Sequence, residues 1–268
     1  MPGTTDDLVP IIRVFGVTNK GYSVCLHIHG FAPYFYVPAP SGFVESHISL
    51  FREALNQSLK REVKQKDLVA LQHMVLAVRL EMKESIYGFH DNRKLPFIRI
   101  TLALPRLIAP AKRILENGFA FSNYSMQSYS IFESNIDFEV RFMVDIGMMG
   151  CCWVEVPKGQ YLLRLDDPSS SRCENQTPTD SLAYAGPKIS PQPKQTRCQI
   201  ELDIAWDSLQ AHPSEKAEWS HIAPIRVLSF DIECAGRKGS HNFTLLMILF
   251  KIKLSYYNLY FVVIQNLM

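Results

Sequence analysis

The sequence predicts an α+β fold in which strands and helices are mixed along the chain. Apolar and polar residues alternate over much of residues 9–37 and again over 199–206, as they do in half-buried strands. Between them, apolar residues at 48, 51, 55 and 59 recur at the spacing of a helix. The 268 residues, 47% of them hydrophobic, can bury one large core or two small ones.

The first part of the chain predicts three strands. Residues 10–17 form the first strand, residues 18–21 supply turn chemistry, and residues 22–29 form the second, so that the two make a hairpin. The aromatic-rich residues 31–38, with proline near both ends, predict the third strand.

The next hundred residues predict two helices and two strands. A helix is expected over residues 46–66, with Ser46 as its N-cap. Residues 76–82 and 96–104 predict strands. Residues 110–117 predict a short helix that ends at Gly118, and residues 131–144 begin as a loop or a short helix.

Residues 166–195 differ in composition from their surroundings. They are rich in Ser, Pro, Thr and Gln, and they offer too little apolar surface to offset the entropy cost of ordering. We therefore expect a disordered insert, after which residues 196–222 return to the preceding domain through the strand at 199–206.

Charge and cysteine content exclude few functions. The net charge of +2 neither requires nor excludes nucleic acid, so a DNA contact would have to come from local basic patches.

The six cysteines include no C-x-x-C pair, which argues against a zinc ribbon and favours reduced thiols. Cys151 and Cys152 are expected to be packing residues. The polar residues 1–7 lack the apolar region of a secretory signal.

Two carboxylates follow a buried strand pattern near residue 230. Asp231 and Glu233 end the apolar run that begins at Val227, and their spacing places both side chains on one face of a strand. Adjacent carboxylates repel each other, and a hard divalent ion such as Mg²⁺ offsets that repulsion. A solvated strand end with two charges is the alternative interpretation.

Several strings in this chain resemble family B replicative DNA polymerases, in particular their delta-type catalytic subunits. The string LSFDIECAGRKG at residues 228–239 is similar to the first exonuclease motif of that family. Four upstream strings occur in the family's order: FGVT at 15–18, CLHIHGFAPYFY at 25–36, LPRL at 104–107 and ESNIDFEVRFMVD at 133–145. The resemblance covers residues 8–165 and 196–239.

The resemblance implies a domain organisation. Residues 1–165 and 196–222 would belong to the amino-terminal domain, with the insert at 166–195 between them. Residues 223–239 would contain the first strand of a truncated RNase H-like 3′–5′ exonuclease domain. Residues 240–268 would be an apolar tail foreign to the family. The apolar run in this tail, at residues 243–250, is too short to span a bilayer, so no membrane is expected as a partner.

The resemblance also implies the chemistry and the partners. Asp231 and Glu233 would be catalytic and would bind Mg²⁺ in a two-metal exonuclease that proofreads DNA replication. Arg237 and Lys238 would position a DNA phosphate or only balance charge. The complete enzyme would act on primer-template DNA and deoxynucleoside triphosphates in the nucleus, with accessory subunits and a sliding clamp. An iron-sulfur cluster is expected only in a carboxy-terminal region of the family that is absent here.

Three weaker groups of candidates have ordinary structural alternatives. His27 and His29 share a strand face and could bind a metal, or they could simply pack. Basic residues before and within the helix at 110–117 could contact phosphates, or they could lie on a solvated face: Arg106, Lys112 and Arg113. Aromatic residues could stack on single-stranded bases in an OB-like groove, or they could form core: Phe31, Tyr34, Phe35 and Tyr36.

The chain by itself carries only two of the carboxylates that such a site needs, because the family takes its further aspartates from later motifs. We therefore expect neither polymerase nor exonuclease activity from these 268 residues alone. A tail from retained intron sequence or an incorrect gene model would explain the departure from the family pattern after Gly239. The alternatives are a truncated isoform that binds single-stranded DNA or a replication partner, and a misfolded fragment with unpaired strand edges.

Overall fold

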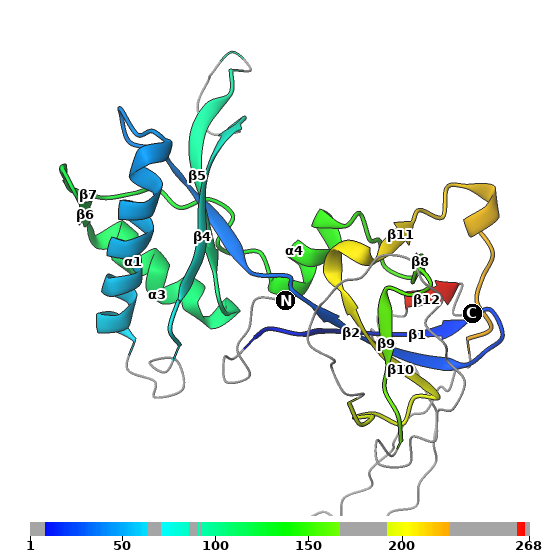
Figure 1. The fold of residues 1–268 in the computed structure, drawn as a ribbon. Coiled ribbons are helices and arrows are strands. Elements are labelled where there is room, and N and C mark those ends of the chain that lie inside the picture. The colour runs from blue at the N-terminus through cyan, green and yellow to red at the C-terminus, as the bar shows by residue number, and fades with distance from the viewer. Residues whose placement is uncertain are drawn as a thin grey trace, which may run out of the picture.

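The computed structural model describes residues 9–63, 71–85, 91, 93–166 and 192–225, together with the backbone of residues 262–265. It shows the mixed α/β architecture that the sequence predicts, with small sheets and short helices (Figure 1). Among these residues, no helix combines the length and the apolar character needed to cross a membrane.

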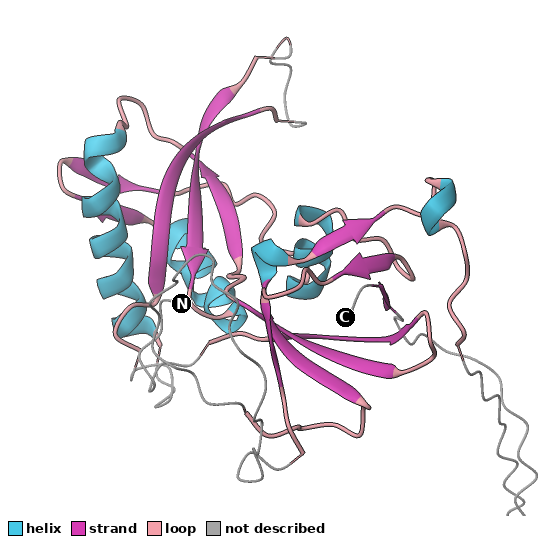
Figure 2. Ribbon diagram, turned by 45° about the vertical axis from the view of Figure 1, so that its right-hand side comes forward, coloured by secondary structure: helices cyan, strands magenta, loops and turns pink. Residues whose placement is uncertain are grey.

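The strands and helices follow one another in a mixed order (Figure 2). The strands are β1 (Ile12–Thr18), β2 (Ser23–His29), β3 (Tyr34–Pro38), β4 (Val75–Lys83), β5 (Leu95–Leu102), β6 (Phe119–Phe121), β7 (Tyr124–Gln127), β8 (Trp153–Glu155), β9 (Tyr161–Leu163), β10 (Ile200–Ala205), β11 (Gln210–His212) and β12 (Val262–Gln265). The α-helices are α1 (Ile48–Glu62), α3 (Ile108–Asn117) and α4 (Phe138–Asp145), and the 3₁₀ turns are η1 (Glu45–His47), η2 (Pro105–Leu107), η4 (Trp206–Ser208) and η5 (Ala217–Trp219).

The larger sheet has seven strands in the order β11-β8-β12-β1-β2-β10-β9. The predicted hairpin is confirmed, because β1 pairs with β2 in antiparallel register from Ile12↔Ile28 to Val17↔Ser23. Gly21 has φ +83 in the connecting turn, a conformation that a residue with a side chain rarely adopts. On the other side, β2 pairs in parallel with β10, so segments far apart in the sequence become neighbours.

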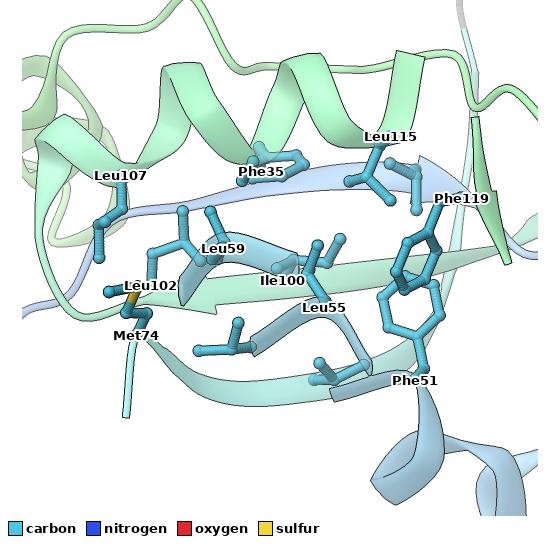
Figure 3. Packing of buried hydrophobic residues seen from close by; sticks show 14 of the residues in the cluster. Phe35, Phe51, Leu55, Leu59, Met74, Ile100, Leu102, Leu107, Leu115 and Phe119 are labelled. Carbon is cyan, nitrogen blue, oxygen red and sulfur yellow. The ribbon is translucent and has the colours of Figure 1, made fainter. Parts of the chain in front are cut away.

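A three-stranded sheet, which we call the small sheet, has the order β3-β5-β4 and is covered on one face by α1 and α3. Strands β6 and β7 form a separate two-stranded sheet. Helix α1 buries Phe51, Leu55 and Leu59 against the small sheet because residues spaced by four share a helix face. Figure 3 shows these side chains packed with Phe35 and Ile100 from the strands. We call this cluster the first core.

A second core lies on the large sheet and reaches the other face of the small one. It gathers Leu26, Phe142 and Val154 from β2, α4 and β8, and it also contains Tyr34 of β3 and Phe97 of β5. Since side chains alternate across a strand, β3 and β5 contribute to both cores.

The third predicted strand is confirmed as β3, which lies in the small sheet beside β5. One local prediction needs correction. The N-cap of α1 is His47 and not Ser46, because the chain first makes the η1 turn, in which Ser46 lies. The predicted strands are confirmed as β4, β5 and β10, with ends within two residues of those expected at 76–82, 96–104 and 199–206. The helix predicted at 110–117 is confirmed as α3, which begins two residues earlier.

Candidate functional site

The predicted catalytic residues lie outside the residues that the structure describes. This applies to Asp231 and Glu233 and to the two basic residues beside them, Arg237 and Lys238. Their roles therefore remain predictions. The described residues instead contain a polar cluster in the large sheet and a cleft between the small sheet and α4.

Two histidines and two carboxylates form a polar ladder across β2 and β10. His27 Nε2 donates to Glu201 Oε1 at 2.5 Å, and His29 Nε2 donates to Asp203 Oδ1 at 2.6 Å. The four side chains share one sheet face because each pair is spaced by two residues and the strands are parallel neighbours. We call these residues the polar ladder. Each histidine is held by a carboxylate, which supports packing over the alternative of an open metal ligand.

Glu201 is fully buried but well supplied with hydrogen-bond donors. The backbone amides of Gln195 and Thr196 donate to it at 3.0 Å each, and the Thr196 hydroxyl donates at 2.8 Å. Burial acts to raise the pKa of Glu201, but the Gln195 amide, His27 and Thr196 together outweigh it and lower the pKa from 4.5 to about 2. The carboxylate therefore stays ionised inside the sheet.

Arg164 completes the ladder from the segment after β9. Its Nε and Nη2 donate to the two oxygens of Asp203 at 2.8 and 2.6 Å, which is a bidentate pair. Burial raises the pKa of Asp203, but His29 and Arg164 overcome this effect and lower it to about 2. Since Arg164 precedes the predicted insert and Thr196 follows it, the ladder joins the two sides of that segment. The expected disorder is wrong for the last residues of the insert, because Gln195 donates to Glu201 and Lys194 donates to the Gln199 carbonyl at 3.0 Å.

Cys25, His27 and Glu201 bring potential ligand atoms within 4.8 Å of one another. Their chemistry fits a hydrogen-bonded cluster better than a metal site. Burial and the charge of Glu201 raise the pKa of the Cys25 thiol to about 12, and burial lowers the pKa of His27. The carboxylate already accepts several hydrogen bonds, and the Arg164 guanidinium lies 4.0 Å away, where it would repel a cation. Cys25, Cys151, Cys152 and Cys198 are free thiols. Cys152 is buried, as predicted for a packing residue, whereas Cys151 is exposed, so the same prediction is wrong for Cys151.

A cleft of about 520 Å³ lies where the small sheet meets α4. Its centre is Tyr34, whose ring lies between the guanidinium groups of Arg99, at 3.6 Å, and Arg141, at 4.6 Å. The Tyr34 hydroxyl donates to both oxygens of Asp145 at 2.8 and 2.7 Å. Burial, reinforced by Asp145, raises the pKa of Tyr34, so the hydroxyl remains a donor.

The cations of the cleft are paired with carboxylates. Arg141 contacts Glu133 at 2.6 Å, and Lys83, the other cation that lines the cleft, lies 3.3 Å from Glu81. Glu133 has φ +59, a costly left-handed conformation for a residue with a long side chain. The positive charges that line this cleft are therefore already offset by neighbouring carboxylates.

The aromatic and basic candidates occupy ordinary structural positions. Phe31, Tyr34, Phe35 and Tyr36 are all at least nine-tenths buried, which supports core packing over base stacking. Two of the basic candidates lie near carboxylates: Lys112 Nζ is 3.7 Å from Glu116, and Arg113 Nη2 is 3.2 Å from Glu62. Contact of Arg106, Lys112 and Arg113 with phosphate stays a prediction.

Sequence reasoning missed three members of the cluster: Arg164, Glu201 and Asp203. A usable signal was present, because His27-x-His29 and Glu201-x-Asp203 are both alternating polar pairs inside apolar strands. Such pairs become satisfied when their strands are neighbours. Only the register between β2 and β10 shows that they are.

Three segments of the chain match families of known proteins. Residues 129–248 match the family described as "DNA polymerase family B, exonuclease domain". Residues 30–109 match "DNA polymerase delta catalytic subunit-like, N-terminal domain", and residues 3–29 match "DNA polymerase zeta catalytic subunit, N-terminal".

Full-length relatives align with most of this chain. The DNA polymerase delta catalytic subunit of Bos taurus is 47% identical over 239 residues, which is 89% of this chain and 19% of that protein. The Drosophila melanogaster subunit is 43% identical over 240 residues, 89% of this chain and 20% of the relative. A solved structure of the family B DNA polymerase from Pyrobaculum calidifontis covers 87% of this chain and 22% of that one, with 20% identity and a TM-score of 0.49.

The chain thus belongs to the family B DNA polymerases. Within that family it corresponds to the amino-terminal region of the delta catalytic subunit, together with exonuclease-domain sequence. It spans about a fifth of the length of the curated relatives that it matches.

Proposed function

We propose that this chain forms the amino-terminal region and the beginning of the 3′–5′ exonuclease domain of a DNA-directed DNA polymerase that replicates DNA. The observation that carries this proposal is the 47% identity over 239 residues to a delta catalytic subunit, combined with an exonuclease-domain match that includes residues 228–239. In the complete protein, the partners would be primer-template DNA, deoxynucleoside triphosphates, accessory subunits and a sliding clamp, in the nucleus.

We propose the domain boundaries expected from the sequence: an amino-terminal domain with OB-like elements at 1–165 and 196–222, an insert at 166–195, and the exonuclease start at 223–239. The last would be the first strand of an RNase H-like domain. The joining of Arg164 to Asp203 and of Thr196 to Glu201 supports the view that the flanks of the insert belong to one folded unit.

Asp231 and Glu233 would hold Mg²⁺, because paired carboxylate oxygens are the ligands that this hard ion prefers. Two bound ions would supply an activated water and stabilise the leaving oxygen in phosphodiester hydrolysis. Arg237 and Lys238 would position the phosphate of the DNA strand being hydrolysed. An iron-sulfur cluster belongs to a different region of the family's longer proteins.

A polypeptide of only these 268 residues would be inactive, since two carboxylates do not complete a two-metal site. The first test incubates the purified chain with Mg²⁺ and a labelled single-stranded oligonucleotide. No shortening is expected. Metal-dependent shortening that Asp231→Ala abolishes would contradict this part of the proposal.

The catalytic role is tested in a complete enzyme, in which residues 1–239 replace the matching region of the Bos taurus subunit. Asp231→Ala together with Glu233→Ala should lower the exonuclease rate by at least about 100-fold, because the metal ligands are lost, while primer extension continues. The exposed Asp207 provides the matched control, and Asp207→Ala should leave the exonuclease rate unchanged. Full proofreading by the double variant would refute the assignment of these two carboxylates.

The alternative of a module that binds single-stranded DNA gains no support from the described residues, whose aromatic candidates are buried. A gel shift at low salt tests it directly, because phosphate contacts weaken steeply as salt is added.

A further inference from the structure

The large sheet contains one strand from outside the matched family region. The exonuclease-domain match ends at residue 248, whereas β12 covers Val262–Gln265. This strand lies inside the sheet rather than at its edge, since it pairs in parallel with β1 on one side and with β8 on the other. In Figure 1 it is the short red arrow beside β8.

The pairing is in continuous register on both sides. Val263 is opposite Val17 of β1 and Trp153 of β8, and Ile264 is opposite Thr18 and Val154. Among the described strands, β8 and β11 join the rest of the sheet only through β12. Two strands that flank a third lie about 9.5 Å apart, which is too far for direct hydrogen bonds between them.

Side-chain packing connects the two flanking strands on both faces of the sheet. Ile12 and Val14 of β1 share the second core with Val154 of β8. On the opposite face, Val17 packs in the small cluster that contains the buried Trp153, whose Nε1 donates to the His221 carbonyl at 2.9 Å. Packing on both faces of the sheet therefore supports β1 and β8 as the two borders of the position that β12 occupies.

We propose that the gap between β1 and β8 is a preformed strand-acceptor site, filled in this chain by its own residues 262–265. The site takes an extended segment of at least four residues, parallel to β1, and it recognises the backbone through ladder hydrogen bonds. Occupation covers two strand edges that would otherwise be free to pair with other chains. An equivalent peptide supplied in trans can occupy the same site.

The first test uses two substitutions at one position in the full chain. Val263→Pro removes a backbone N–H from the ladder, whereas Val263→Thr keeps it and retains a residue that favours strands. In the proline variant, amides of residues 16–18 and 153–155 should exchange hydrogen about tenfold faster, and the threonine variant should match the wild type. Adding a peptide of residues 259–268 in excess should restore the protection.

Unchanged hydrogen exchange in Val263→Pro, or failure of the peptide to restore protection, would overturn the proposal.

A second measurement applies if the proline variant does not fold. Val17→Cys with Val263→Cys joins paired positions and should form a disulfide on mild oxidation, while Val17→Cys with Ile264→Cys is out of register by one residue and should not. Equal cross-linking of the two pairs would also overturn the proposal.

Discussion

At the scale of single residues, the polar ladder shows how a sheet interior can hold ionised groups. Glu201 is completely buried, yet its oxygens receive hydrogen bonds from His27, Thr196 and two backbone amides. A buried carboxylate without such partners would take up a proton. The ladder therefore depends on all of its members at once, and loss of one leaves the others unsatisfied.

Glu201→Ala should lower the free energy of unfolding by about 3 kcal/mol, because it leaves His27, the Thr196 hydroxyl and two backbone amides without their acceptor. Urea unfolding monitored by circular dichroism measures this value. The control is Glu62→Gln, which removes a surface carboxylate paired with Arg113 and should change stability by less than about 0.5 kcal/mol. Similar losses in the two variants would show that the ladder has no special role.

Stability should fall as the pH is lowered. The folded-state pKa values of Glu201 and Asp203, about 2, lie below their ordinary values of 4.5 and 3.8, so the unfolded chain takes up these protons first. Their stabilisation is complete above about pH 4.5 and disappears as the pH approaches 2. The lowered pKa of His27 acts in the same direction below pH 6.5.

The measurement is the urea midpoint between pH 7 and pH 3. Glu201→Gln cannot ionise at this position, so its stability should depend less steeply on pH below 4.5 than that of the wild type. Curves of equal slope for the two proteins would contradict the assignment of acid sensitivity to Glu201.

At the scale of elements, the end of α3 illustrates how one residue determines the path of the chain. Gly118 follows the helix with φ +121 and ψ 125, which only glycine adopts at low cost, and the chain turns directly into β6. Strand β6 then returns Phe119 and Phe121 to the first core, against Phe51 of α1.

Gly118→Ala should reduce the free energy of unfolding by about 1–3 kcal/mol, chiefly through backbone strain. The new Cβ would also lie 3.0 Å from Met126 Sδ, although that exposed side chain can move. Gly150 is the matched control, because nothing lies within 4 Å of a Cβ added there, and Gly150→Ala should change stability by less than about 0.5 kcal/mol. Thermal or urea unfolding of both variants distinguishes the strained position from the open one.

At the scale of the whole molecule, the small sheet couples the two cores. Strand β3 sends Phe35 into the first core and Tyr34 into the second, and β5 does the same with Ile98 and Phe97. Loosening either core therefore disturbs the same two strands. The two halves of the described structure should behave as one cooperative unit.

Unfolding in urea should give coincident transitions from two probes. The three tryptophans, Trp153, Trp206 and Trp219, all pack on the side of the second core, so their fluorescence reports that half. Far-ultraviolet circular dichroism is weighted toward α1 and α3, which cover the first core. A fluorescence midpoint that differs clearly from the circular dichroism midpoint would show that the halves unfold separately.

Local pattern by itself determined the elements whose side chains face a core. The alternation in β1, β2 and β10 and the helical spacing of Phe51, Leu55 and Leu59 predicted these elements close to their observed bounds. The strings at 25–36 and 228–239 also identified the family, because long ordered strings carry more information than composition.

The tertiary structure alone decided which elements are neighbours. The sequence did not predict that β3 joins β5, that β2 and β10 bring two histidines to two carboxylates, or that β12 separates β1 from β8. Short strands such as β8 and β11 have too few residues for a recognisable period. Pairing between distant segments depends on the packing of both sheet faces together, which no local pattern along the chain records.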